Sequence, residues 1–241
     1  MKLTDFKALT FDCYGTLIDW ESGIWDGLQP LLTGLGKTIL REQALADYGE
    51  EEHAQELATP SLKYSELLAR VHQRLAKRWG AKADAALDKD FGAFVPYWPA
   101  FPDSADALRY LKQHYKLVIL SNVDRQSFNG SNRRLGVAFD AIYTAEDIGS
   151  YKPDPRNFEY LLAHVKSDLG LDRSAILHTA QSLFHDHVPA ERAGLARAWI
   201  NRRKGKTGSG ATKIPERMPK LHFEHASLGE LAEAHRRETG A

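Results

Sequence analysis

The sequence is poor in cysteine and carries no excess charge, and each absence excludes a class of protein. A single cysteine among 241 residues excludes an internal disulfide framework and a cysteine-based zinc site. The 32 basic and 32 acidic residues cancel, so the composition gives no reason to expect a nucleic acid or a membrane surface as partner. The short basic cluster at 202–204 is expected to be a solvated loop.

Long apolar segments are missing as well. No stretch approaches the roughly 18 apolar residues that a membrane span requires. The first residues, MKLTDFKALTF, lack the apolar core of a signal peptide. A single cysteine is also typical of a reducing compartment. We therefore expect a soluble, cytoplasmic protein.

What the chain does contain is an alternation of strands and helices, interrupted by one long helical stretch. A short strand is predicted at 7–11, and apolar residues at helical spacing then recur through residues 18–97. From residue 98 onward, predicted strands and helices alternate, which favours a parallel sheet with helices on both faces. The predicted fold class is therefore α/β, a Rossmann-like parallel sheet with a helical insert.

Polar residues follow four of the predicted strands. They are Asp12, then Ser121 and Asn122, then Lys152, and finally Gln181, Ser182 and Asp186. In open α/β sheets, ligands bind outside the carboxyl ends of the strands. We therefore expect the four loops to converge on one rim of the sheet.

Four motifs, in this order, resemble the haloacid dehalogenase superfamily: FDCYGTL, ILSN, YKPDPRNF and AQSLFHD. The resemblance covers nearly the whole chain. It implies a catalytic core formed by residues 1–17 and 98–241, and an inserted cap domain at 18–97.

Four residues are predicted to be catalytic. Asp12 stands where a carboxylate can attack carbon or phosphorus, and a carboxylate that is held and desolvated can act as a covalent nucleophile. Thr16 can hydrogen-bond Asp12 and fix its orientation. Lys152 would neutralise both Asp12 and Asp186 and keep Asp12 ionised at neutral pH.

Six further residues are predicted to bind the substrate. Ser121, with neighbouring backbone amides, would hold an anionic group, and Asn122 would help to bind that group or the leaving group. Arg41 is the positional candidate for the cap arginine with which the family cradles halide or carboxylate. The remaining three are Tyr14, Gln181 and Cys13, the last through its backbone amide.

The residue at position 14 distinguishes two reactions. Phosphatases of the superfamily carry an aspartate there, which protonates the leaving alcohol, and they begin the fourth motif with Gly-Asp, where this chain has Ala180 and Gln181. A hard divalent cation needs several oxygen ligands, so neither a metal nor another cofactor is expected. A halide leaves without a proton, and the pattern D-x-Y-G-T-L is typical of the type II 2-haloacid dehalogenases. The resemblance therefore implies that short 2-haloalkanoic acids are hydrolysed to 2-hydroxy acids and halide through an ester on Asp12.

Other interpretations remain open. A magnesium-dependent phosphatase and a non-catalytic family member are the two alternatives. The chain departs from well-characterised dehalogenases at Phe158, where they have tyrosine, and at Gln181 and Leu183. The expected partner is a small halocarboxylate. A homodimer is compatible with the resemblance, and the apolar stripe along 67–79 would serve either a dimer or the core of the cap. The acidic run at 50–52 is expected to be a solvated helix face.

Overall fold

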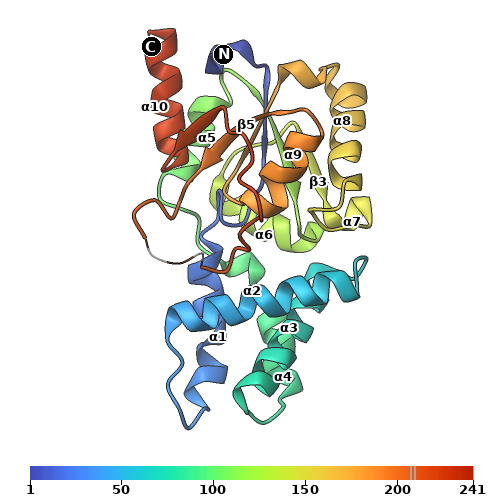
Figure 1. Ribbon diagram of the computed structural model, residues 1–241, viewed down its shortest axis with the longest axis vertical. Helices are drawn as coiled ribbons and strands as arrows, with labels where there is room; N and C mark the ends of the chain where they lie inside the picture. The colour runs from blue at the N-terminus through green and yellow to red at the C-terminus, as the bar shows by residue number, and fades with distance from the viewer. Residues whose placement is uncertain (207, 209, 241) are drawn as a thin grey trace.

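A parallel sheet forms the centre of the computed structural model, which describes residues 1–206, 208 and 210–240 (Figure 1). Its strands are β1 (Ala8–Phe11), β2 (Lys116–Ser121), β3 (Ala141–Thr144), β4 (Ile176–Ala180), β5 (Ala196–Ile200) and β6 (Phe223–His225). The spatial order is β3-β2-β1-β4-β5-β6 and all five pairings are parallel. The predicted α/β class is confirmed. The three-residue β6 was not predicted, because it is too short to show an alternating pattern.

Helices cover both faces of this sheet. They are α5 (Ser104–Leu111), α6 (Arg125–Leu135), α7 (Ala145–Ile148), α8 (Arg156–Leu169), α9 (Val188–Arg192) and α10 (Leu228–Thr239). Successive side chains of a strand point to opposite faces, and two apolar clusters result. Leu9 and Phe11 of β1 pack in the larger cluster, whereas Ala8 packs in the smaller one together with Leu161 and Val165 of α8.

A separate group of helices lies at one end of the sheet (Figure 1). It consists of α1 (Trp20–Thr33), α2 (Arg41–Ala58), α3 (Tyr64–Trp79) and α4 (Ala85–Gly92), and residues 12–115, all of them described, contribute no strand to the sheet. We call these four helices the helical layer. The proposed boundaries of a cap at 18 and 97 stay a prediction, and residues 207, 209 and 241 of the expected core lie outside the described residues.

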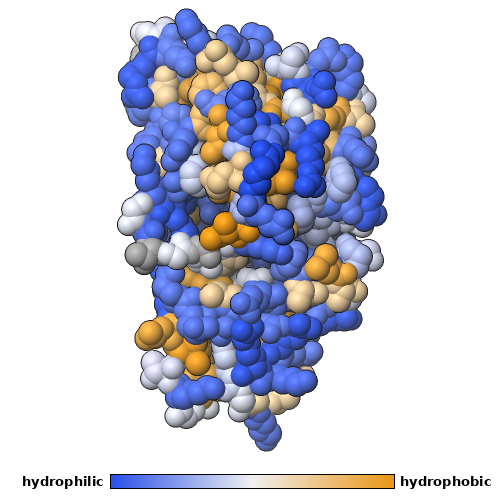
Figure 2. All heavy atoms as spheres, in the orientation of Figure 1, coloured by the Kyte–Doolittle hydropathy of each residue, from blue (hydrophilic) through white to orange (hydrophobic). Residues whose placement is uncertain are grey.

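The apolar stripe of α3 is the core of the helical layer. Leu67, Leu68, Val71, Leu75 and Trp79 are all buried within the single chain. The stripe is therefore not an exposed dimer face. Figure 2 shows a mainly hydrophilic surface on which apolar residues form separate patches. None of the described helices has the length and apolarity needed to cross a membrane.

The solvated loop expected at 202–204 is wrong for Arg202 and Arg203, whereas Lys204 is exposed. The side chains of Arg202 and Arg203 are only 8% and 11% exposed. Arg202 pairs with Asp103 at 2.6 Å, and Arg203 pairs with Glu21 of α1 at 2.7 Å. Composition could not reveal these pairs, because their members lie about 100 and 180 residues apart in the chain.

Trp98 and Gly23 form a tight contact where the helical layer meets the core. Trp98 is fully buried, and a Cβ atom added at Gly23 of α1 would overlap its indole ring. Gly229 of α10 is a matched site without that crowding, since an added Cβ would meet its nearest neighbour, Asp103 Cβ, at 3.4 Å.

We expect Gly23→Ala to lower the free energy of unfolding by about 1–3 kcal/mol, because overpacking costs more than the helix propensity of alanine returns. Gly229→Ala should be neutral or should stabilise the protein by up to about 1 kcal/mol. Urea denaturation of both variants measures the difference. Equal changes in the two variants would contradict the prediction and would mean that α1 shifts enough to accommodate the methyl group at Gly23.

Candidate active site

The end of the central strand β1 carries Asp12, and three neighbouring segments bring polar groups to it. Ser121 ends β2, Lys152 lies in the loop after α7, and Asp186 lies in the π-helical turn η4 (Leu183–His187) that follows β4. All four residues line one cavity, whose empty space of about 440 Å³ is partly open to solvent. The convergence expected at this rim of the sheet is observed.

Lys152 is the centre of the polar network. Its ammonium donates hydrogen bonds to Asp12 Oδ1 at 3.0 Å, to Asp186 Oδ1 at 2.7 Å and to the carbonyl oxygen of Leu120 at 2.9 Å. The side chain is only 1% exposed, and an ammonium has three protons to donate, so each finds an acceptor. Burial lowers the pKa of Lys152, but the two carboxylates outweigh it and hold that pKa above its usual value. Burial likewise opposes ionisation of Asp186, yet Lys152 and His178 hold its pKa below its usual range.

A second set of contacts orients Asp12 through Oδ2, the carboxylate oxygen that Lys152 does not bind. Thr16 Oγ1 donates to Asp12 Oδ2 at 2.7 Å and accepts from the backbone N–H of Gln181 at 2.9 Å. The guanidinium of Arg202 donates to the carbonyl oxygen of Thr16 at 2.8 and 3.1 Å, which fixes the turn from the far side. Gly15 has φ +90°, a backbone conformation that side chains rarely adopt. Burial raises the pKa of Asp12 to about 6 against the opposing effect of Lys152.

His178 belongs to this network although its role was not predicted. It lies fully buried in β4, with Nε2 3.0 Å from Asp186 Oδ1 and Nδ1 2.9 Å from Thr10 Oγ1. Burial lowers its pKa, so a neutral ring donates to Asp186 and accepts from Thr10. The ring of Phe158 packs edge-on against the imidazole, with 5.1 Å between centroids. The sequence did contain a signal for this role, since His178 is a histidine within an otherwise largely apolar strand.

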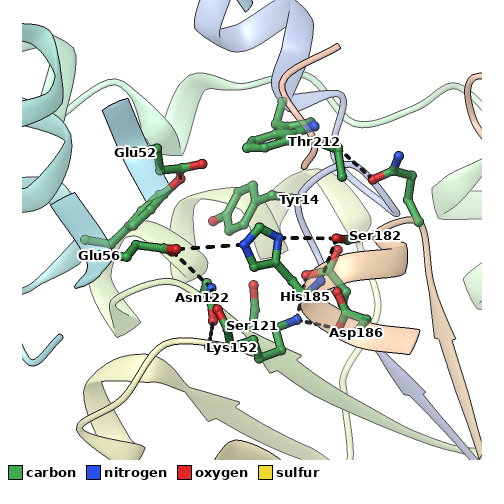
Figure 3. A pocket seen from close by; sticks show the side chains of 14 residues that line it. Tyr14, Glu52, Glu56, Ser121, Asn122, Lys152, Ser182, His185, Asp186 and Thr212 are labelled. Carbon is green, nitrogen blue, oxygen red and sulfur yellow. Dashed lines mark hydrogen bonds and ion pairs between the residues drawn. The ribbon is translucent and has the colours of Figure 1, made fainter. Parts of the chain in front are cut away.

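The helical layer contributes acidic side chains to the cavity (Figure 3). Glu52 Oε1 accepts from Tyr64 at 2.6 Å and from Tyr48 at 2.8 Å, and burial raises the pKa of Glu52 to about 7. Glu56 Oε1 accepts from Asn122 at 3.1 Å, and burial, together with Glu52, raises the pKa of Glu56 well above its ordinary value. The solvated face expected at 50–52 is therefore wrong for Glu52, which is 6% exposed.

The substrate-binding predictions divide into three groups. Tyr14, Ser121, Asn122 and Gln181 line the cavity. Cys13 is buried and is not among the lining residues. Arg41 is exposed at the first residue of α2, donates to Ser22 Oγ at 3.2 Å, and is not among the lining residues.

The expected position of Arg41 at the cavity is thus wrong. The part of α2 that faces the cavity lies three to four turns further along the helix. The sequence alone does not show which turn of a helix packs over the core.

Two buried oxygen atoms at the site have no hydrogen-bond partner among the described residues. They are Ser121 Oγ and Asp186 Oδ2. The amide of Asn122, in contrast, is occupied, because Nδ2 donates to Glu56 and to the Lys152 carbonyl while Oδ1 accepts from the Lys152 N–H. A bound molecule or water therefore finds free polar contacts at Ser121 and Asp186, and also at Nε2 of His185, which lines the same cavity.

Comparisons with known proteins indicate one family of hydrolases. The family model described as haloacid dehalogenase-like hydrolase matches residues 6–178. The (S)-2-haloacid dehalogenase of Pseudomonas putida is 28% identical over 221 residues, which cover 84% of this chain and 88% of that protein.

Solved structures show the same fold. The L-2-haloacid dehalogenase of Xanthobacter autotrophicus superposes with a TM-score of 0.77 at 20% identity, over 96% of this chain and 98% of the other. The L-2-haloacid dehalogenase PA0810 superposes with a TM-score of 0.75 at 24% identity, over 98% and 100%.

We expect Lys152→Met to lower the free energy of unfolding at neutral pH by about 3–5 kcal/mol, because it leaves two buried carboxylates without a cation. The deficit should shrink as the pH falls, since protonation then removes the uncompensated charge. Lys166→Met is the matched control: it breaks an exposed pair with Asp172 at 2.9 Å and should cost less than about 1 kcal/mol. Chemical denaturation at two pH values tests both, and similar losses in the two variants would contradict the buried network.

Proposed function

The chain belongs to the haloacid dehalogenase-like hydrolases, and we propose that it hydrolyses the carbon–halogen bond of short 2-haloalkanoic acids. The proposal depends on one observation: the carboxylate of Asp12 is held in place, but the residue two positions on cannot serve as a general acid. Asp12 is oriented by Lys152 and Thr16, whereas Tyr14, two residues on, hydrogen-bonds Ser131 at 3.0 Å. Burial raises the pKa of Tyr14 well above its ordinary value. Such a group is a poor acid for an alkoxide, and a halide needs none.

In the first step, a carboxylate oxygen of Asp12 attacks C2 of the substrate from the side opposite the halogen. The new C–O bond forms as the carbon–halogen bond breaks, and the halide leaves with the bonding electron pair. Attack from the rear inverts the configuration at C2. The hydroxyl of Ser121, which lacks another partner, would donate to the substrate carboxylate.

In the second step, water hydrolyses the ester. Its oxygen adds to Cγ of Asp12, and the tetrahedral intermediate expels the 2-hydroxy acid, whose new hydroxyl oxygen came from Asp12. One proton of the water passes to that oxygen, and the other is released as Asp12 returns to its ionised form. Asp186 Oδ2 is the free acceptor that would orient the water, and its ion pair with Lys152 keeps it ionised.

The scarcity of oxygen ligands speaks against the phosphatase alternative. Tyr14 and Gln181 stand where the superfamily's phosphatases have carboxylates, so magnesium would find fewer of the charged oxygen ligands that it needs. The named (S)-2-haloacid dehalogenase relatives support the halocarboxylate assignment.

The direct test is halide release from L-2-chloropropionate, chloroacetate and fluoroacetate in magnesium-free buffer. We expect chloride from at least the L-2-chloro acid, with D-lactate as the organic product. Phosphate release from phosphate monoesters, seen only after magnesium is added and without any halide release, would replace the proposal by the phosphatase alternative.

A second prediction concerns the covalent step. In a single turnover in ¹⁸O-labelled water, we expect the label in the peptide that contains Asp12 and not in the 2-hydroxyl group of the product. Asp12→Asn should abolish turnover, because an amide is not a nucleophile of comparable strength. Label found first in the product would show that water attacks the substrate directly.

A third prediction concerns pH. Only the ionised carboxylate attacks, and burial places the pKa of Asp12 at about 6, so ester formation should fall about tenfold per pH unit below about pH 6. In the wild type, the hydrogen bond from Thr16 lowers the pKa of Asp12. Thr16→Val removes this bond, so the pKa should rise and the limb should move to higher pH. Thr16→Ser keeps the hydroxyl and should leave the limb in place. A wild-type limb near the ordinary aspartate pKa would contradict the effect of burial.

A further inference from the structure

Three side chains that the proposed reaction does not use face one another beside the cavity. His53 and Glu56 lie one helical turn apart on α2, and His185 comes from the turn η4. One potential ligand atom of each lies within 4.8 Å of those of the other two. Figure 3 shows the Glu56 carboxylate and the His185 ring directed toward each other. The cluster thus spans the helical layer and the sheet.

Each histidine has one ring nitrogen that is engaged and one that is not. Nδ1 of His185 lies 3.2 Å from Ser182 Oγ, while its Nε2 is buried without a hydrogen-bond partner among the described residues. Nε2 of His53 lies 3.1 Å from Lys213, while its Nδ1 is likewise buried and unpartnered. Burial lowers the pKa of both rings, that of His185 to about 4, so both are neutral at pH 7. Neutral imidazole is the form that binds metals.

The spacing is close to that of a metal site. Glu56 Oε2 lies 3.9 Å from His185 Nε2. Ligand atoms around tetrahedral zinc lie about 3.3 Å apart, given bonds of about 2.0–2.1 Å. Small side-chain rotations would therefore bring the ligands to bonding distance. Two imidazoles and one carboxylate are typical of zinc and related transition metals, with a further position left open, whereas magnesium prefers oxygen ligands.

The carboxyl group of Glu56 binds a cation by giving up its proton. Burial and the neighbouring Glu52 raise the pKa of Glu56, so metal binding should release a proton there. Lys213 is the neighbour that opposes a cation at His53, but its side chain is exposed and can turn toward solvent. Lys152 is already paired with two carboxylates.

We propose that His53, Glu56 and His185 bind one divalent transition-metal ion of the zinc type, which links α2 to the turn Leu183–His187 beside the cavity. The site does not depend on the proposed function, since binding requires neither substrate nor turnover. Its effect is to join the helical layer to the core at the active site.

The experiment is titration calorimetry of the tag-free, chelator-treated full chain with ZnCl₂ and, separately, with MgCl₂. We expect one zinc per chain with a dissociation constant of about 1 μM or tighter, and no comparable heat with magnesium. Glu56→Gln and His185→Gln should each weaken zinc binding at least about 100-fold, because loss of a ligand costs more than loss of an outer-shell partner. His164→Ala, which alters a partly exposed histidine on α8, should bind zinc as the wild type does.

Thermal unfolding supplies the folding control. Zinc should raise the Tm of the wild type and of His164→Ala, and should leave the Tm of both ligand variants unchanged, provided their circular dichroism is native. The proposal is overturned if zinc at about 100 μM does not bind, if the ligand variants keep wild-type affinity, or if magnesium binds equally well. Failure of halide release would not alter the zinc isotherm, so the two proposals fail separately.

Discussion

The buried ammonium of Lys152 is the interaction on which the site depends. Two carboxylates and one amine have left water together, and such burial is tolerated only when each charge is paired and each proton has an acceptor. Here the third acceptor is the carbonyl oxygen of Leu120 in β2, so the charge network is tied to the sheet itself. Because the sheet order includes β3-β2-β1-β4, the four chain segments that supply Lys152, Leu120, Asp12 and Asp186 are adjacent at one edge. The position of Asp12 is thereby set by the same contacts that stabilise the fold.

A second layer of contacts holds that arrangement in place. Thr16 is fixed on one side by the backbone of Gln181 and on the other by Arg202, whose guanidinium also lies over the ring of Phe101 at 4.0 Å. His178 supports Asp186 from within β4. Each of these groups restrains an atom that the proposed chemistry uses, and a held nucleophile needs less reorganisation to reach its transition state.

The wall supplied by the helical layer has a different character. Where the resemblance led us to expect an arginine, the cavity meets Glu52 and Glu56. Their raised pKa values mean that burial disfavours their charge, and the hydroxyl groups of Tyr48 and Tyr64 satisfy one of the Glu52 oxygens. An anionic substrate meets less repulsion when Glu52 and Glu56 carry protons or when a cation is bound to them. The proposed metal site uses Glu56, so it would change the charge of this acidic wall.

The sequence by itself determined most of the strands and helices, and which polar residues stand at the strand ends. Apolar runs ending in Asp12, Ser121 and Gln181 are local patterns, and the alternation of strands with helices implies that parallel strand ends share an edge. Tertiary structure alone decided what faces that edge. Whether Arg41 or Glu56 reaches the cavity depends on which turn of α2 lies over the core, and whether Arg202 is solvated depends on Asp103, about 100 residues away in the chain. Such contacts arise from packing between distant segments, and no local pattern of residues records them.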